Sequence, residues 1–298
     1  MLTNTCPIEK KGDLRVMFYN IYGYDNDENY GGKRGGPIAL RHAEQIEIFE
    51  SYDADVMGFQ EYVTTSHNIL TPKIAELGYL EVPSTRPEGD KVNDTPIFYK
   101  ESRLTLKSSG YHLFHERVEG VPVSCNNAFT KSLSWAVFEK KTDGKQFAFI
   151  STHLMYTADI SSREAAMQYH IARSANVVEL FGILDEIQKE YPNIPVIVGG
   201  DLNSYPGSDA FTKLQTRLTW MQEASGVNAD TLGFKGYSTY SYETKEYTVC
   251  PNPPATGYGI DHAFYCGALD VINYLTLTDR ASLLASDHCP KLADIALH

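Results

Sequence analysis

The chain has 298 residues, of which 42% are hydrophobic and 21% charged, a composition typical of soluble globular proteins rather than disordered ones. Its net charge of −12 argues against a broad basic surface for duplex nucleic acid. No apolar run approaches the roughly 20 residues of a membrane-spanning helix, and the opening MLTNTCPIEKKGD lacks the apolar core of a secretory signal. We expect a soluble protein without membrane insertion, cytoplasmic or secreted after removal of a signal peptide.

The first part of the sequence predicts a strand, a loop, a helix and a second strand, in that order. Residues 14–20 (LRVMFYN) form a short apolar run typical of a buried strand. Residues 22–37 are rich in glycine and polar side chains and predict a long loop, and such loops are often functional. Residues 38–50 carry apolar side chains close to a helical spacing. Residues 55–60 (DVMGFQ) predict a second buried strand.

The remainder of the chain alternates in the same loose way. Further buried strands are predicted at residues 133–138, 146–152, 195–200 and 260–265. A long helix is predicted at 162–190, with Ser161 or Ser162 as its cap and Tyr191-Pro192 as its stop, and a second long loop at 237–258. We expect mixed sheets covered by helices, in a single domain over 1–298 with a core from about residue 13 and an N-terminal extension over 1–12.

The cysteines are scattered and odd in number. Cys6, Cys125, Cys250, Cys266 and Cys289 show neither a CxxC pair nor a spacing typical of zinc sites. We expect mostly buried thiols and no disulfide framework.

Short polar groups follow or interrupt the apolar runs where the predicted strands end. They are Asn20, Gln60-Glu61, Thr152-His153, Asp201 with Asn203, Asp261-His262 and Ser286-Asp287-His288. A sheet that brings such strand ends to one edge builds a single site. The sequence therefore predicts one polar site assembled from residues that lie far apart in the chain.

The order N…QE…THL…GDLN…IDH…SDH resembles that of the endonuclease/exonuclease/phosphatase superfamily, which includes apurinic endonucleases, DNase I, neutral sphingomyelinases, inositol polyphosphate 5-phosphatases and deadenylases. The match runs from Asn20 to His288. Any one tripeptide is weak evidence, but six motifs in the right order are strong evidence. The resemblance implies a four-layered α/β/β/α sandwich, DNase I-like, in which two mixed sheets pack face to face between outer helices, with a Mg²⁺ site at one edge that Mn²⁺ can also fill.

The resemblance also implies roles for individual residues. Glu61, Asn20 and Asp287 match metal-site positions, and their oxygen atoms suit Mg²⁺. The expected catalytic residues are His153, Asp201, Asn203, Asp261 and His288. In this assignment His153 contacts the scissile phosphate, Asp201 and Asn203 orient the attacking water and the phosphoryl oxygens, and Asp261 partners His288. Arg41 joins His153 and Asn203 as an expected substrate-binding residue.

Each of these residues also has an ordinary structural interpretation. Polar residues often end strands, Asp-Leu-Asn-Ser is typical of turns, and either histidine of the THL and SDH motifs could be a core side chain. The coincidence of six motifs favours the joint functional interpretation. The motifs do not include His42, His67, His112, His115, His170 or His298, and His262 is expected to be structural.

Two loop features are weaker signals. The glycine-rich segment 31–36 lacks the spacing of a phosphate-binding loop, so Lys33 and Arg34 are expected at most to contact substrate from the rim. Tyr237, Tyr240, Tyr242 and Tyr247 are expected to be half-buried strand residues, and an aromatic wall beside the pocket is the alternative.

The expected function is Mg²⁺-dependent hydrolysis of a phosphate ester, as a phosphomonoesterase or a phosphodiesterase, on a small or single-stranded substrate. A nuclease built on the same core and a non-catalytic binding module are the alternatives. The acidic charge disfavours the nuclease and tight binding of duplex DNA, and the full set of catalytic residue types disfavours the binding module. The expected partner is a phosphorylated small molecule or phosphodiester, and no partner protein is indicated. Whether His288 or Asp201 acts as the general base is left open by the sequence.

Overall fold

Two six-stranded sheets form the centre of the protein, as seen in the computed structural model, which describes residues 5–23, 38–83, 95–114, 131–157, 161–225, 238–241, 246–249 and 259–298. The first sheet consists of β1 (Leu14–Asn20), β2 (Val56–Gln60), β3 (Tyr79–Glu81), β4 (Ile97–Lys100), β13 (Leu269–Thr276) and β14 (Lys291–Leu297). The second consists of β5 (Leu104–Leu113), β6 (Ser132–Lys140), β7 (Gln146–His153), β8 (Val196–Asp201), β9 (Thr219–Trp220) and β12 (Asp261–Cys266). Their strand orders are β13-β14-β1-β2-β4-β3 and β5-β6-β7-β8-β12-β9.

The two sheets pack face to face, and alternation along their strands explains how. In β1, Val16 and Phe18 belong to the core between the sheets, whereas Met17 and Tyr19 belong to a core on the outer face. The ring of Phe18 stacks on that of Phe149 in β7, with centroids 4.7 Å apart. Successive side chains of a strand point to opposite faces, so continuous apolar runs fit strands buried on both sides.

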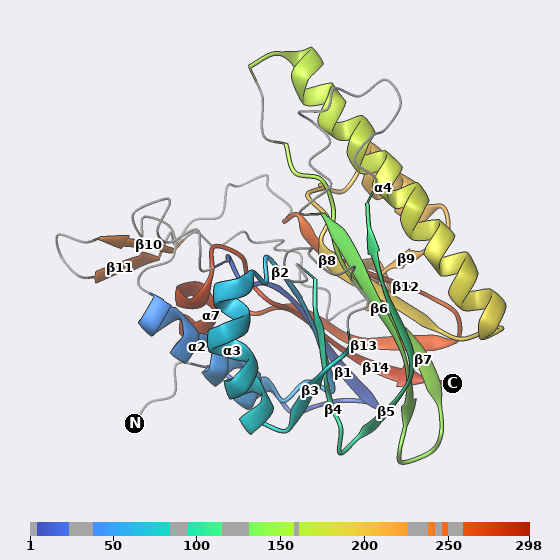
Figure 1. The fold of residues 1–298 in the computed structure, drawn as a ribbon, viewed down its shortest axis with the longest axis horizontal. Coiled ribbons are helices and arrows are strands. Elements are labelled where there is room, and N and C mark those ends of the chain that lie inside the picture. Colours follow the sequence, from blue (N-terminus) through green and yellow to red (C-terminus); the bar gives the residue numbers. More distant parts are fainter. Residues whose placement is uncertain are drawn as a thin grey trace.

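Helices cover both outer faces (Figure 1). On the first sheet lie α2 (Ile38–Tyr52), α3 (Thr64–Glu76) and α7 (Arg280–Ala285), which share an apolar cluster with the outward side chains of β1 and β2. On the second lie α4 (Arg163–Glu190) and α5 (Asp209–Gln215), which pack on the outward side chains of β7 and β8. A one-turn helix, α6 (Met221–Ala224), follows β9. The layers run helix, sheet, sheet, helix, which confirms the predicted four-layered sandwich.

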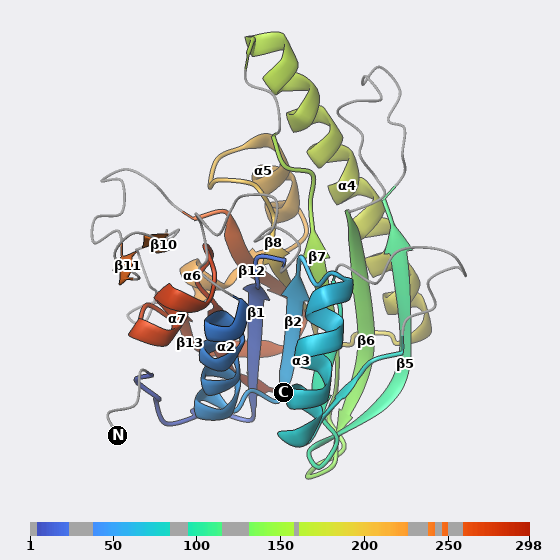
Figure 2. The same ribbon diagram turned by 60° about the vertical axis from the view of Figure 1, so that its left-hand side comes forward.

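The helix α4 is the longest element and its first turns extend beyond the sheets in both views (Figures 1 and 2). It begins directly after Ser162 and ends before Tyr191-Pro192, as the sequence predicts. The predicted helix over residues 38–50 continues to Tyr52. Among the described residues, none of the helices is both long enough and apolar enough to pass through a bilayer.

The prediction of a loop over residues 237–258 is partly wrong. This segment contains an antiparallel hairpin of β10 (Ser238–Ser241) and β11 (Glu246–Val249), which pairs Tyr240 with Tyr247. Alternating Ser, Thr and Tyr residues suit a strand, and cross-strand pairing outweighs the turn-forming composition of the segment. Tyr237, Tyr242 and the rest of this loop lie outside the described residues.

The cysteines agree only in part with the expectation of buried thiols. Cys289 is buried, Cys266 is half-buried and Cys6 is exposed. Cys125 and Cys250 lie outside the described residues.

Candidate active site

Five strands begin or end at one edge of the sandwich. The parallel pair β1 and β2 aligns Asn20 with Gln60, and the parallel pair β7 and β8 aligns His153 with Asp201. Strand β12 runs antiparallel to β8 and begins with Asp261 directly opposite Asp201. Because the carboxyl ends of parallel neighbours lie at the same edge, the polar residues that follow each apolar run are brought together.

The backbone at this edge adopts rarely populated conformations. Tyr22, Glu61 and Asn203 have φ values of 55°, 57° and 48°, in the left-handed region that non-glycine residues seldom occupy. Gly200, with φ 136°, has no room for a side chain, because a Cβ atom there would lie 2.1 Å from the carbonyl oxygen of Thr152. Such strain persists only where the surrounding structure holds it, and it gathers at functional sites.

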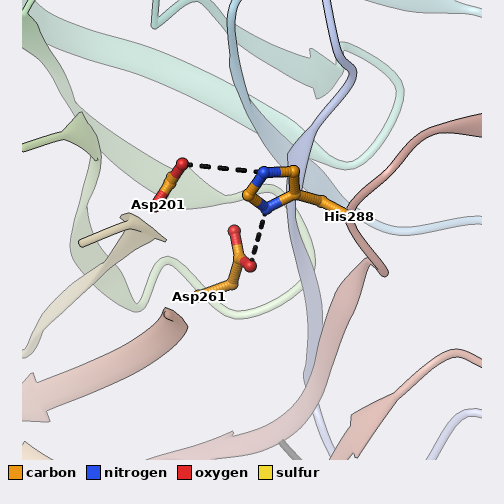
Figure 3. Close-up of side chains that lie close together, drawn as sticks. All are labelled: Asp201, Asp261 and His288. Atoms are coloured by element: carbon orange, nitrogen blue, oxygen red, sulfur yellow. Dashed lines mark hydrogen bonds and ion pairs between the residues drawn. The ribbon is translucent and has the colours of Figure 1, made fainter. Parts of the chain in front are cut away.

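His288 and Asp261 form a buried pair (Figure 3). The His288 Nδ1 atom lies 2.8 Å from Asp261 Oδ2, and the Nε2 atom on the other side of the ring faces Asp201 Oδ2 at 3.9 Å. A neighbouring residue, Asp287, places its Oδ1 atom 3.8 Å from the same Nε2. The carboxylate on Nδ1 fixes the orientation of the ring and leaves Nε2 to face the site.

Three carboxylates control the charge of this imidazole. Burial alone would lower the pKa of His288, but Asp261, Asp287 and Asp201 outweigh it and raise the pKa to about 10. In this arrangement the ring is a cation at neutral pH and a hydrogen-bond donor at both nitrogens.

Asp201 is the centre of the hydrogen-bond network. Its Oδ2 atom accepts a hydrogen bond from Asn20 Nδ2 at 3.0 Å and lies 3.5 Å from His153 Nε2. Its Oδ1 atom accepts one from the backbone N–H of Asn203 at 2.9 Å. The Asn203 side chain in turn donates to the carbonyl of Leu154, the last residue of the THL motif, at 3.0 Å. These contacts tie the ends of β1, β7 and β8 to one carboxylate.

Glu61 is half-buried and presents its carboxylate to the same site. It accepts hydrogen bonds from Asn20 Nδ2 at 3.3 Å and from the backbone N–H of Gly23 at 3.2 Å. Burial alone would raise the pKa of Glu61, but His153, Lys131 and His288 together with the Asn20 hydrogen bond lower it below its usual value. Glu61 is therefore held as an anion, as a metal ligand must be.

The donor set suits a hard divalent cation. Glu61, Asp201, Asp261 and Asp287 bring four carboxylates to one edge, and carboxylate oxygens are the ligands that Mg²⁺ and Mn²⁺ prefer. One atom each of Asp201, Asp261 and His288 lies within 4.8 Å of the others. Asp261 is less available to a metal, because its carboxylate is hydrogen-bonded to His288. Glu61 is the better candidate for the principal ligand, because its oxygens face the site from a separate strand end.

Asn20 lies where the sequence predicts, with one difference in orientation. Its Oδ1 atom accepts the backbone N–H of Tyr22 at 3.0 Å, so its amide nitrogen, and not its oxygen, faces Glu61 and Asp201. In this orientation Asn20 holds the two carboxylates together as a donor. Ligation of a metal by Asn20 requires the amide to turn over, which exchanges its oxygen and nitrogen.

Arg41 makes structural contacts in this arrangement, and its expected contact with substrate stays a prediction. Arg41 is fully buried, and its guanidinium donates to the backbone carbonyls of Ile21, Tyr22 and Ala285. The planar guanidinium carries several donors and no acceptor, so it suits a group of converging carbonyls. Arg41 therefore fixes the backbone between β1 and α7, and its position in the sequence alone did not reveal its burial.

Three further residues support the site, and the sequence assigned no role to any of them. Buried Ser286 donates from Oγ to the carbonyl of Asn20 at 2.8 Å and accepts the backbone N–H of His288 at 3.1 Å. Arg173 of α4 donates to the carbonyls of Met155 and Asn203. Buried Lys131 contacts the ring nitrogens of His153. Ser286 lies within the SDH motif, but Lys131 and Arg173 carry no motif signal.

His262 is a structural residue, as expected. It is buried, its Nε2 atom lies 3.1 Å from the carbonyl oxygen of Ser204, and its ring packs edge-on against Phe211 and Trp220. Burial lowers its pKa to about 3, so the ring is neutral. Lys33, Arg34 and His115 lie outside the described residues.

The profile of the Endonuclease/Exonuclease/phosphatase family matches residues 17–288. The chain therefore belongs to this family. The matched range begins in β1 and ends at His288, so it contains every strand end that contributes to the site.

Among curated proteins, the chain is similar to Protein angel homolog 2 of Mus musculus, with 26% identity over 214 residues that cover 68% of this chain and 37% of that protein. The chain thus spans little more than a third of that relative.

Solved structures share the fold. An endonuclease/exonuclease/phosphatase from Bacteroides vulgatus superposes with a TM-score of 0.69 at 19% identity, covering 97% of this chain and 100% of that one. The mannosyl-6-phosphatase of Bacteroides thetaiotaomicron gives 0.68 at 18%, covering 95% and 100%. ANGEL2, a 2',3'-cyclic phosphatase in complex with adenosine-2',3'-vanadate, gives 0.65 at 18%, covering 97% and 99%. These likenesses define the DNase I-like architecture of the chain.

Proposed function

We propose that the chain is a divalent-metal-dependent hydrolase of phosphate esters that acts on a small or single-stranded substrate. The observation that carries the proposal is the convergence of the His288–Asp261 pair, Asp201 and His153 beside Glu61 at one edge. Family membership supports the same reaction class. The relatives also include enzymes named as phosphatases, one for mannosyl-6-phosphate and one for 2',3'-cyclic phosphates.

The reaction joins a water oxygen to phosphorus while the bond from phosphorus to the ester oxygen breaks. Asp201 is the group we assign to the water, because its Oδ2 atom lies between the ring nitrogens of His153 and His288. A carboxylate in that position accepts a hydrogen bond from the attacking water and takes its proton as the new bond forms. The hydrogen bonds from Asn20 and Asn203 fix the orientation of the Asp201 carboxylate.

The two histidines serve the phosphoryl group in this proposal. His288 donates from Nε2 to a phosphoryl oxygen while Asp261 holds Nδ1, and His153 donates from the opposite side. Donors that are already in place stabilise charge as it develops without reorganisation, and a single donor of this kind contributes on the order of 10²–10³-fold to the rate.

The residues that would hold the cation are Glu61, Asp287 and, after an amide turn, Asn20. When bound to these residues, a divalent ion would supply charge neutralisation for the phosphoryl oxygens. The excess of carboxylates over cationic side chains at this edge favours such an ion. Asp201 and His288 remain assigned to water and phosphate, so each group has a separate role.

The experiment is a screen of phosphate release from sugar phosphates, nucleotides, phosphodiesters, phospholipids and plasmid DNA, each with Mg²⁺, with Mn²⁺ and with EDTA. We expect metal-dependent release from at least one small ester and no activity in EDTA. Activity that persists in EDTA would remove the metal from the proposal. Preferential cutting of plasmid DNA would favour the nuclease alternative.

A further inference from the structure

Lys131 is a buried cation beside the candidate catalytic residues. It directly precedes β6, and the residue is only 6% exposed. Its Nζ atom lies 3.1 Å from Nδ1 of His153 and also contacts Nε2 of that ring. The same Nζ lies 5.2 Å from the ring centre of Tyr156, which is itself 41% exposed. The ammonium group therefore sits at the edge of His153 that carries both ring nitrogens, between the site and an exposed aromatic residue.

This environment is unusual for a buried lysine. A buried charge is costly unless hydrogen bonds or an opposite charge compensate for it. The ammonium has three donors and no acceptor. A neutral imidazole offers an acceptor at only one of its two nitrogens, so His153 compensates Lys131 only in part. The Glu61 carboxylate, whose pKa Lys131 helps to lower, is shared with His153 and His288. A substrate anion placed against His153 would complete the environment of the lysine.

We propose that Lys131 binds a non-bridging oxygen of the substrate phosphoryl group beside His153, and that it makes the site prefer phosphomonoesters to phosphodiesters. This inference rests on the proposed function and names the class of substrate. His153 connects Lys131 to the carboxylate that we assign to the water. Its Nε2 atom lies 3.5 Å from Asp201 Oδ2, and Lys131 contacts the same ring.

The preference follows from charge and from the number of acceptors. A phosphomonoester carries about −1.5 to −2 at neutral pH and offers three strong acceptor oxygens. A diester has one negative charge and two non-bridging oxygens, so it gains less from an additional ammonium donor. Lysine acts on phosphate as a compact point charge. The binding free energy that its ammonium contributes therefore grows with the charge of the ligand.

The test replaces Lys131 by methionine, which has a similar length and no charge. The kcat/KM values for p-nitrophenyl phosphate and bis-p-nitrophenyl phosphate are measured with Mg²⁺, and the affinity for inorganic phosphate is measured by calorimetry. For Lys131→Met we expect losses of about 10- to 100-fold on the monoester and in phosphate affinity, the size of a charged hydrogen bond. The loss on the diester should not exceed about fivefold, the size of a weak charge interaction.

Lys140→Met is the matched control. Lys140 is a buried lysine at the opposite end of β6, where it pairs with Asp143 at 3.0 Å, away from the site. This variant should keep both kcat/KM values and the phosphate affinity. If Lys140→Met lost monoester activity to the same extent as Lys131→Met, the effect would be one of buried charge in general, and the proposal would be overturned.

Further outcomes separate this inference from the proposed function. Equal losses on both esters, or an unchanged phosphate affinity in Lys131→Met, would overturn the role of Lys131 while the hydrolase proposal stands. A wild-type chain that hydrolyses no phosphate ester with any divalent metal would remove both. If Lys131→Met fails to fold, a structure of the wild-type chain with Mg²⁺ and inorganic phosphate decides. Nζ within hydrogen-bond distance of a phosphate oxygen supports the proposal, and phosphate bound away from Lys131 overturns it.

Discussion

The Nδ1 atom of His288 lies 2.8 Å from the Oδ2 atom of Asp261, although the two residues are 27 positions apart in the chain. Asp261 is fixed at the start of β12 by pairing with β8. His288 is fixed because its backbone N–H donates to Ser286, whose hydroxyl donates to the carbonyl of Asn20. The pair is therefore held by backbone contacts from both sides before any substrate binds, which is the preorganisation that catalysis needs.

The first prediction concerns this pair. We expect His288→Ala to lower kcat by at least ~10³-fold, because it removes a positioned cationic donor to the phosphoryl group and leaves Asp261 without its partner. Asp261→Asn should lower kcat less, since the imidazole remains and only its orientation and charge change. Steady-state kinetics on the best substrate of the screen checks both, and His153→Ala should be severely impaired as well.

A second histidine–aspartate pair provides the control. His298 Nε2 lies 2.9 Å from Asp270 Oδ2 near the C-terminus, and both side chains are more than half exposed. His298→Ala and His42→Ala should retain wild-type kcat. If His288→Ala kept most of its activity while either control lost it, the assignment of the site would be wrong.

The second prediction concerns metal binding. Glu61→Ala should weaken binding of Mg²⁺ and Mn²⁺ beyond detection by calorimetry and abolish hydrolysis, because it removes the anionic oxygen ligand that we assign to the ion. EDTA should abolish wild-type activity, and added Mg²⁺ should restore it. Glu76→Ala, at the exposed end of α3, is the control and should bind metal as the wild type does. Undiminished metal affinity in Glu61→Ala would move the ion to other ligands, such as Asp201 and Asp261.

The predictable part of the fold was the part buried on both faces. Strands such as β1, β2 and β8 are continuous apolar runs, because each lies between the other sheet and a helical layer. The edge strand β5 was missed, since none of its residues after Leu104 is buried and its sequence lacks an apolar run. The helix α3 was missed as well: it contains Pro72, and only three of its residues are buried.

The site was predictable as a set of strand ends, but the roles of charged residues around it were not. Motif order selected Asp201, His153 and Asp261, whose proximity follows from strand pairing. Arg41 and Lys131 show the limit of that approach. Whether an arginine or lysine is buried, and whether it meets carbonyls or a ring, depends on packing between elements distant in sequence.

The third prediction concerns nucleic acid. With a net charge of −12, the chain should bind duplex DNA no more tightly than the roughly 10⁻⁴–10⁻⁶ M typical of non-specific binding at physiological salt. A gel-shift titration of a short duplex at two salt concentrations, in EDTA to prevent cleavage, measures this. A shift at nanomolar protein and moderate salt would contradict the prediction and favour the nuclease alternative.

The fourth prediction concerns stability and pH, and it depends on His262. The folded protein holds this imidazole at a pKa of about 3, whereas an unfolded histidine titrates near 6.5. Between these two values the unfolded chain binds more protons than the folded one. The stability contributed by neutral His262 is therefore complete above pH 6.5 and is lost as the pH falls toward 3. The slope from this one group is at most about 1.4 kcal/mol per pH unit.

His262→Phe separates this effect from that of the carboxylates. Phenylalanine keeps an aromatic ring between Phe211 and Trp220 but loses the hydrogen bond to the Ser204 carbonyl, so the variant should be less stable at pH 7.5 by about 1 kcal/mol. Its free energy of unfolding should then decline less steeply than that of the wild type between pH 6.5 and 4.5, because nothing at this position takes up a proton. Urea unfolding at several pH values measures both slopes, and His298→Phe, at an exposed position, should follow the wild type. Parallel curves for His262→Phe and the wild type would mean that His262 does not titrate on unfolding as its burial requires.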